Sequence, residues 1–300
     1  MNDAYIGIDI GGTYIKGVLI DDGEIKNKVT KETNDHQGLW QQATAAVLEE
    51  LIGNTNGQAK CVGLSAPGLT DNENRTISCM PGRLEGLEHF DWTGFLKQDV
   101  HVLNDAHAAL VAESRWGVAA DIPNVVMLTL GTGIGGGLLI NGQLQQGFLH
   151  RAGHLGHISI DSASESRGIT GITGSLEDAV GEATLSQRSL GKFNSSRDLV
   201  TAYLAGDTWA TYVWLTTVRK LALGIVSFCN MISPDLVVLA GGITKAKEHL
   251  LGPISTFMDL YEWRPGGHAT PIKLAKFEEF AGAIGAALFA QSKNHGSPIP

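Results

Sequence analysis

Two glycine-rich turns, each placed after an apolar run, are the parts of this chain best suited to bind phosphate. The first is Gly11-Gly12-Thr13, which follows the run 5–10, and the second is the stretch 131–137, which follows the run 125–130. Glycine lets backbone amides come close to an anion, and a threonine hydroxyl adds a donor. Two such loops predict that two half-domains hold one polyphosphate from opposite sides.

Both turns also have a conformational explanation, because a tight β-hairpin needs glycine. Beside the first turn, Asp9, Thr13 and Lys16 favour phosphate binding. Asp9 is suited to hold a hydrated cation that screens phosphate charge, whereas Lys16 either adds positive charge there or is a solvated strand lysine. In the second turn, five glycines in seven residues exceed what a hairpin needs.

Composition narrows the class of protein. The 300 residues carry a net charge of −9, which argues against a nucleic-acid-binding surface. Cys61, Cys79 and Cys229 are far apart and form no CxxC pair, which is typical of reduced thiols in a cytosolic protein. The start of the chain lacks the pattern of a signal peptide, so we expect a cytoplasmic location. The charge-free stretch 122–149 contains too many Gly, Asn and Gln residues to predict a membrane span.

Hydrophobic periodicity predicts which elements position these loops. The first half should contain strands at 5–10, 15–20, 24–31, 60–64 and 100–103, with helices at 37–53 and 106–116. The order then restarts, with strands at 125–130, 138–140, 143–146 and 236–240 and helices at 208–232 and 280–291. The segment 221–232 is apolar but too short to span a membrane, so we expect a core helix there. Alternation of strands and helices predicts an α/β protein, and the restart predicts a duplicated fold.

The restart also predicts two domains with a cleft between them. The small N-terminal domain should contain residues 1–116 and about 280–293. The larger C-terminal domain should contain 117–279, in which 147–200 looks irregular and polar and is expected to be an inserted segment that faces the substrate.

An ordered set of motifs resembles the ROK family of sugar kinases, which belongs to the actin-like, hexokinase-like ATPase superfamily. The motifs are Asp9-Ile10-Gly11-Gly12-Thr13, Asn104-Asp105-Ala106, Gly131-Thr132-Gly133, Gly153-His154-Leu155-Gly156-His157, Gly174-Ser175-Leu176-Glu177 and Gly241-Gly242-Ile243. The resemblance covers nearly the whole chain. It implies a duplicated actin-like (ribonuclease H-like) fold and ATP-dependent phosphorylation of a hexose or a close derivative. Glucose is the default sugar and O6 the accepting oxygen; ATP and Mg²⁺ are the implied cofactors.

The resemblance assigns Asp105 as the general base that takes a proton from the sugar hydroxyl as it attacks the γ-phosphate. Taken alone, an Asp between a short strand and a helix is equally well explained as a helix N-cap. The preceding Asn104 resembles a residue that hydrogen-bonds the sugar, and the alternative is a turn former.

The phosphate-binding roles follow from the same resemblance. Asp9 is implied on the Mg²⁺ side, acting through water, and its alternative is a strand-end carboxylate bonded to loop amides. The residues implied in nucleotide binding are Gly11, Gly12, Thr13, Lys16, Thr132, Gly133, Gly241 and Gly242. The last two would pass close to the adenosine, or else form only a strand-to-helix turn.

His157 and Glu177 resemble the sugar-binding His and Glu of the family, and sugar discrimination needs such fixed polar partners. The alternatives are a core histidine and an acidic residue in a first helical turn. Where the family usually has Glu, three residues before this histidine, the chain has His154. A carboxylate that accepts from two hydroxyls is thus replaced by an imidazole with at most one acceptor, so the sugar's identity stays open.

Two further departures concern zinc and a second sugar contact. Many family members bind zinc through the histidine that corresponds to His157 and through three cysteines. Here the thiolates would stand near Gly168, Thr170 and Ser175, so we expect no zinc site. The Pro-Asn pair that often contacts the sugar reads Pro81-Gly82, with Arg83 as a possible substitute.

Several other functions are compatible with parts of this pattern. Some ROK members are sugar-responsive regulators, but these carry a DNA-binding helix-turn-helix ahead of the body, and here the first phosphate strand begins at Tyr5. A non-catalytic sugar-binding relative is a second alternative. An actin-like structural ATPase is disfavoured by the Asn104-Asp105 pair. We therefore expect a small-molecule sugar as the partner, no nucleic acid and no membrane. Because dimers are common in the family, the resemblance is compatible with a homodimer.

Overall fold

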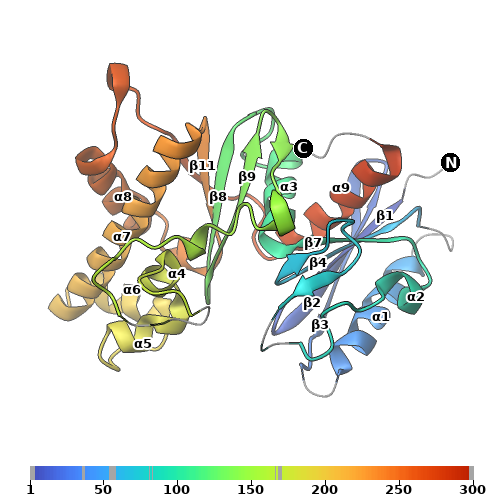
Figure 1. Cartoon of the computed structure of the whole chain (residues 1–300). Helices are drawn as coiled ribbons and strands as arrows, with labels where there is room; N and C mark the ends of the chain where they lie inside the picture. Colours follow the sequence, from blue (N-terminus) through green and yellow to red (C-terminus); the bar gives the residue numbers. More distant parts are fainter. Residues whose placement is uncertain are drawn as a thin grey trace. The chain divides into compact units, whose positions relative to one another are not determined.

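The computed structural model describes residues 4–35, 38–53, 59–80, 82, 84–165, 167 and 171–296. Contacts divide the chain into two compact units (Figure 1). Unit 1 consists of Met1–Asp121, Leu138–Ala152 and Lys276–Pro300, and unit 2 of Ile122–Gly137 and Gly153–Ala275. The domain boundaries expected from the sequence remain predictions.

Unit 1 contains a mixed five-stranded sheet in the order β3-β2-β1-β4-β7. Its elements are β1 (Tyr5–Ile10), β2 (Tyr14–Asp21), β3 (Glu24–Glu32), α1 (Leu39–Ile52), β4 (Val62–Ala66), β5 (Leu69–Thr70), β6 (Ile77–Cys79), α2 (Trp92–Leu96), β7 (Val100–Asn104), α3 (Asp105–Trp116), β10 (Gln143–Leu144), a 3₁₀ turn η1 (Phe148–His150) and α9 (Ala281–His295). Strand β1 pairs antiparallel with β2 and parallel with β4, and β4 pairs parallel with β7. The carboxyl ends of these three parallel strands therefore meet at one edge of the sheet.

A second five-stranded sheet has the order β10-β9-β8-β11-β12. Its other strands are β8 (Val125–Leu130), β9 (Ile134–Ile140), which runs from unit 2 into unit 1, β11 (Leu236–Ala240) and β12 (Ile272–Leu274). In both sheets the spatial order is third, second, first, fourth and fifth strand along the chain. This repeated topology confirms the predicted duplicated α/β fold.

Along the chain, the helices of unit 2 come after β9 and before β12. They are η2 (Leu155–His157), α4 (Leu176–Val180), η3 (Glu182–Thr184), α5 (Leu185–Arg188), α6 (Ser196–Leu204), α7 (Thr208–Ile232), η4 (Gly242–Ala246), α8 (Glu248–Tyr261) and η5 (Pro265–Gly267). The sequence analysis described 147–200 as irregular, and its helices of three to nine residues are too short to show a clear helical period. It also missed α8, whose pattern is interrupted by Pro253, and the three-residue β12.

The 25-residue helix α7 is long and apolar enough to cross a membrane by length and composition alone. Half of its most apolar window is buried inside the protein, however. It packs against α4, α6 and α8, and Trp214 donates its indole N–H to the His249 carbonyl at 3.0 Å. These contacts are those of a core helix, the role expected for 221–232.

The last helix, α9, packs into unit 1 at very short range. It lies against β1, β4 and α3, and glycines stand at the closest approaches. A Cβ atom on Gly63 would lie 1.8 Å from the Ala286 carbonyl oxygen, and one on Gly285 would lie 1.7 Å from the Ala108 carbonyl oxygen. Because a larger residue cannot fit at such distances, these glycines let the helix sit directly on the sheet and on α3.

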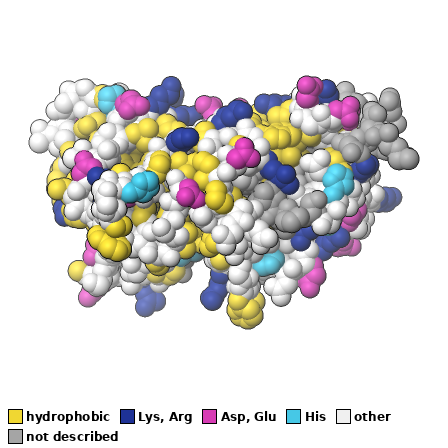
Figure 2. All heavy atoms as spheres, turned by 90° about the horizontal axis from the view of Figure 1, so that it is seen from above, with side chains coloured by type: hydrophobic (Ala, Val, Ile, Leu, Met, Phe, Trp, Pro, Cys, Tyr) yellow, Lys and Arg dark blue, Asp and Glu magenta, His cyan; other side chains and the backbone are white. Residues whose placement is uncertain are grey.

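The charged side chains show no concentration of basic residues on the face drawn in Figure 2. There, Lys and Arg side chains are scattered between acidic and hydrophobic ones. The described residues of this face therefore form no basic patch of the kind that a nucleic-acid-binding surface uses.

Candidate functional site

Two carboxylates lie at the carboxyl edge of the unit 1 sheet. Asp9 near the end of β1 is in register with Ser65 of β4, and Asp105 directly follows β7. The Ser65 hydroxyl donates to Asp9 Oδ1. Burial raises the pKa of Asp9 to about 6; the Ser65 hydrogen bond and Lys16 lower it, and repulsion from Asp105 raises it further. Because these two carboxylates repel each other at one edge of the sheet, a cation bound beside them would stabilise their ionised forms.

Close packing helps to fix the position of Asp9. A Cβ atom on Gly282, in the first turn of α9, would lie 2.5 Å from the Asp9 carboxyl carbon. The absence of a side chain at 282 thus lets the carboxylate lie against the first turn of a helix, where the amide dipoles favour negative charge. The sequence analysis identified Asp9 but not this role of Gly282.

Asn104 and Asp105 share the start of α3. The Asn104 side-chain oxygen accepts from the amides of Ala106 and His107 at 3.0 and 3.2 Å, and its Nδ2 donates to the Gly68 carbonyl at 3.0 Å. Asn104 is therefore the helix cap that the sequence analysis gave as the alternative for Asp105. Asp105 occupies the first helical position with an exposed side chain.

In the glycine turn of unit 1, Gly11-Gly12-Thr13, two of the three carbonyls are hydrogen-bonded. Thr33, which is fully buried after β3, donates its hydroxyl to the Gly11 carbonyl at 2.6 Å and its amide to the Thr13 carbonyl at 3.0 Å. No described residue accepts a hydrogen bond from the amides of Gly12 or Thr13. The turn therefore offers donors, as an anion site requires. Thr33 carries no motif signal, and the sequence analysis missed it.

Lys16 lies opposite Asp9 on the neighbouring strand. Its ammonium group lies 3.4 Å from Glu279 Oε2 and 6.0 Å from the centre of the Phe280 ring. Its side chain is 16% exposed, so the alternative of a freely solvated strand lysine does not describe it.

The glycine turn of unit 2 is arranged in the same way with different supports. Its Gly131 and Thr132 carbonyls accept from the amides of Glu182 and Ala183, each at 3.0 Å. In the part of the chain that the structure describes, the amides of Thr132 and Gly133 donate to no acceptor. In this turn too, carbonyl groups are hydrogen-bonded to the protein, and two amides are available to an anion.

Glu177 takes part in this support. Its Oε2 accepts from the Ile134 amide at 2.9 Å, and a Cβ atom on Gly133 would lie 2.3 Å from the same oxygen. The structure thus brings a residue that the sequence analysis placed at the sugar directly against the predicted phosphate loop. Its role in sugar binding remains a prediction.

His154 and His157 lie side by side in unit 2, with ring centres 6.0 Å apart and planes 13° from parallel. His157 Nδ1 is buried and has no partner among the described residues. Burial, with a smaller contribution from His157, lowers the pKa of His154 to about 4, so this imidazole is neutral at physiological pH.

The neutral state of His154 has a measurable consequence for stability. Because its pKa falls on folding, the unfolded chain binds more protons between about pH 4 and 6.5, and stability is lost as the pH falls through that window. We expect His154→Gln to remove about 1 kcal/mol of the loss in unfolding free energy between pH 7 and pH 5. Urea unfolding at both pH values measures this. Asp9 titrates with the opposite sign in the overlapping range, so only the difference between the two proteins is informative; equal losses would contradict the prediction.

Gly241 stands directly after β11 with a φ of 92°, which favours glycine. A Cβ atom there would lie 2.4 Å from the Leu130 carbonyl oxygen, at the end of β8. Gly242 next to it is exposed and has open space around its Cα. The pair therefore borders the unit 2 glycine turn, as a nucleotide-contacting turn would; contact with adenosine remains a prediction.

The stretch expected to lack zinc is only partly described, because Gly168 and Thr170 lie outside the described residues. Ser175 caps α4 by accepting from the Asp178 amide at 3.0 Å. The described residues contain no group of three or more His, Cys, Asp or Glu side chains placed to hold a metal ion. Backbone pairing and the Lys220–Asp161 ion pair, at 3.2 Å, hold the described part of this stretch.

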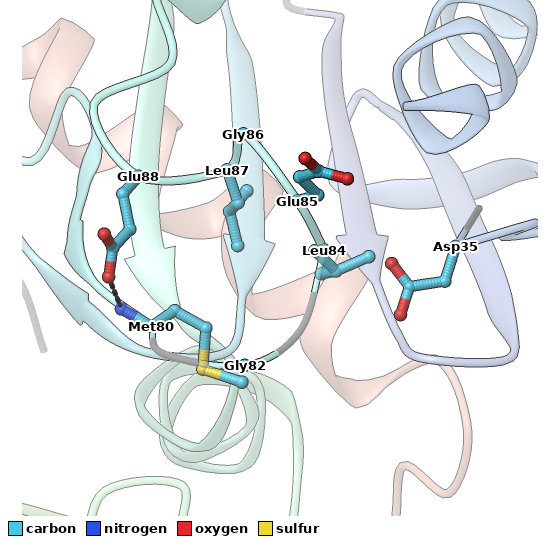
Figure 3. A pocket seen from close by; sticks show the side chains of 8 residues that line it. All are labelled: Asp35, Met80, Gly82, Leu84, Glu85, Gly86, Leu87 and Glu88. Atoms are coloured by element: carbon cyan, nitrogen blue, oxygen red, sulfur yellow. Dashed lines mark hydrogen bonds between the residues drawn. The ribbon is translucent and has the colours of Figure 1, made fainter. Parts of the chain in front are cut away.

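Unit 1 also has a cavity of about 560 Å³ beside the segment that follows β6 (Figure 3). It is lined by Asp35, Met80, Gly82, Leu84, Glu85, Gly86, Leu87 and Glu88. Glu88 is held at the rim by the Met80 amide at 2.6 Å. In the pair that stands where the family often has a Pro-Asn sugar contact, Gly82 lines this cavity. Pro81 and the neighbouring Arg83 lie outside the described residues.

The chain is similar to known proteins both in sequence and in structure. The model of the ROK family matches residues 5–293. A glucokinase from Thermotoga maritima is 29% identical, covering 97% of this chain and 98% of its own. An N-acetylmannosamine kinase from Escherichia coli O1:K1 is 30% identical, covering 96% and 98%. The crystal structure of a ROK family glucokinase from Streptomyces griseus, in complex with glucose and AMPPNP, superimposes with a TM-score of 0.80 at 25% identity, covering 96% of this chain and 99% of its own.

Proposed function

The chain is a sugar kinase of the ROK family, and we propose that it transfers the γ-phosphate of ATP to a hexose, most simply to O6 of glucose or a close derivative. The observation that carries this proposal is the pair of glycine turns, each with occupied carbonyls and two available amides. One turn lies beside Asp9 and the other beside Glu177. Relatives named glucokinase and N-acetylmannosamine kinase support a hexose or amino-hexose acceptor.

Asp105 is the proposed general base. As the sugar oxygen forms its bond to the γ-phosphorus, the carboxylate accepts the hydroxyl proton, and the bond from phosphorus to the β–γ bridging oxygen breaks to release ADP. Its exposed position at the start of α3 leaves the carboxylate accessible. Asn104 holds the base in place through its hydrogen bonds to the α3 amides and Gly68.

The residues of unit 1 also fit Mg²⁺. One Asp9 oxygen is held by Ser65, and repulsion from Asp105 is relieved when a cation is close. Mg²⁺ commonly uses one or two carboxylates together with water and phosphate oxygens, so a full protein cage is not needed. When bound, the ion would neutralise charge on the phosphates. We propose that Asp9 holds it through water, with Gly11, Gly12, Thr13 and Lys16 on the same side of the nucleotide.

In unit 2, Thr132 and Gly133 would contact the phosphates and Gly241 and Gly242 the adenosine. His154, His157 and Glu177 would contact the sugar. His154 is neutral and offers at most one acceptor, so the sugar hydroxyl opposite it finds a weaker partner than a carboxylate. The three free cysteines support a cytoplasmic location for this enzyme.

Release of ADP tests the proposal. The purified chain is incubated with MgATP and, in separate reactions, with glucose, mannose, fructose, N-acetylglucosamine and N-acetylmannosamine. We expect at least one of these sugars to stimulate ADP release well above the rate without sugar and to yield a sugar 6-phosphate. Sugar binding without any stimulation would instead support a non-catalytic relative, and phosphorylation at another hydroxyl would overturn the O6 assignment.

A further inference from the structure

The unit 2 glycine turn is supported by one short corner of the chain, which runs from α4 through η3. The Gly131 and Thr132 carbonyls accept from the amides of Glu182 and Ala183. A Cβ atom on Gly181 would lie 2.9 Å from the Thr132 carbonyl oxygen, so the two backbones are in direct contact. The orientation of the turn therefore depends on the shape of this corner.

The corner is itself held by a half-buried arginine. Arg188 Nη2 donates to the carbonyls of Val180 and Gly181 at 3.2 and 2.8 Å. Its Nε donates to Thr184 Oγ1 at 3.1 Å, and its Nη1 donates to Thr217 Oγ1 on α7 at 2.6 Å. The Thr184 hydroxyl in turn donates to the Asp178 carbonyl at 2.6 Å. One guanidinium thus satisfies the carbonyls left open where α4 ends and ties them to the long helix behind.

The partners of Arg188 are unusual for a half-buried cation, because every acceptor that its guanidinium contacts is a neutral oxygen. No described Asp or Glu forms an ion pair with it. Burial lowers its pKa to about 10, with no acidic group opposing the shift. The charge of this half-buried guanidinium has no counter-ion among the described residues. A polyanion bound at the nearby loop, which leaves two amides without acceptors, would be attracted to it.

We propose that Arg188 is a positioning residue for nucleotide binding: it shapes the α4–η3 corner so that the loop 131–134 turns its amides toward the phosphates, and it adds positive charge behind them. This inference rests on the proposed function, because it takes ATP as the ligand of that loop. Arg188 does not touch the substrate in this proposal and acts only through the corner and the loop.

Arg188→Met tests the proposal, since methionine keeps much of the apolar stem and removes the fork of donors. In the full chain we expect the KM for ATP and the calorimetric Kd for MgATP to rise roughly 10- to 100-fold. The KM for the sugar and the kcat at saturating ATP should change little, because the lost interaction concerns nucleotide binding. Arg188→Lys retains the charge but loses the fork, so it should recover only part of the affinity.

Arg219→Met is the matched control. Arg219 lies on α7, is exposed, and donates to the Tyr261 hydroxyl at 2.7 Å, far along the chain from the loop. The Arg219→Met protein should bind MgATP with the same affinity as the wild type. A folded Arg188→Met protein with wild-type affinity for MgATP overturns the proposal, as does an equal rise in the KM values for ATP and for sugar.

Thr217→Val decides the matter if Arg188→Met does not fold, because it leaves Arg188 in place and removes only one acceptor. We expect a rise of about two- to fivefold in the Kd for MgATP; an unchanged Kd refutes the proposal. Direct binding also separates the two hypotheses. A wild-type chain that binds MgATP but phosphorylates no sugar contradicts the proposed function alone, whereas a wild-type chain that binds no MgATP contradicts both.

Discussion

Asp105→Asn is expected to lower kcat by about 10²- to 10⁴-fold while the protein remains folded and still binds both substrates. Asp105 is exposed at the first position of α3, so its replacement removes no core packing. Its Oδ1 accepts from the Ala106 amide at 2.8 Å, and the side-chain oxygen of asparagine retains that acceptor. What the variant lacks is a group basic enough to take the proton of the sugar hydroxyl.

The measurement is the steady-state rate of ADP release with the stimulating sugar, together with calorimetric titration of sugar and MgATP. Asp198→Asn is a matched control, because Asp198 is also an exposed acid in the first turn of a helix, α6. It should leave kcat unchanged. Turnover of the Asp105→Asn protein close to that of the wild type would remove Asp105 from the mechanism.

Asp9→Asn is expected to make the protein more stable and much less active. Burial raises the Asp9 pKa from 3.8 to about 6, so the folded state holds a proton more tightly than the unfolded chain does. The stabilisation from that proton is complete below about pH 3.8 and is lost as the pH rises through 6. At pH 8 the wild type therefore bears the cost of an ionised, largely desolvated carboxylate. A shift of about two units corresponds to a ceiling of about 3 kcal/mol, and partial solvent access reduces it, so we expect a gain of about 1–3 kcal/mol.

Urea unfolding at pH 8 and at pH 4 measures the effect, and the gain should shrink at the lower pH. In the same protein we expect activity to fall by roughly 10²-fold or more, because an amide neutralises no cation and binds Mg²⁺ water weakly. Ser65→Ala is a useful comparison, because it leaves the charge of Asp9 and removes one hydrogen bond to it. An Asp9→Asn protein that is less stable than the wild type at pH 8 would show that the ionised Asp9 carboxylate does not destabilise the folded state.

The parts of the fold with strong periodic patterns could be predicted from the sequence. Helix α7 and strand β11 begin and end at the expected residues, and the order of elements indicated the duplication before the two sheets showed it. Short elements could not be predicted in this way. In α4, α5 and η3, packing against neighbouring segments decides the conformation, and three to five residues carry too little periodicity to reveal it.

The candidate site divides along similar lines. Glycines and acidic residues after strands are visible in sequence because backbone conformation restricts the residue type. Thr33 and Arg188 are not, since each acts on carbonyl groups that become neighbours only through tertiary folding. Glu177 shows the limit of motif analysis: the motif identified the residue, while its contact with the Ile134 amide came from the structure.

The packing of α9 against β1, β4 and α3 affects how the protein is made. Residues 281–295 complete the core around strands that are synthesised first, and the backbone of this helix fills the space that the absence of a side chain at Gly63 leaves. The ribosome must therefore synthesise the chain as far as residue 295 before strands β1 and β4 attain a native interior. Until then the nascent N-terminal sheet exposes an apolar surface of the kind that makes incompletely folded chains prone to aggregate.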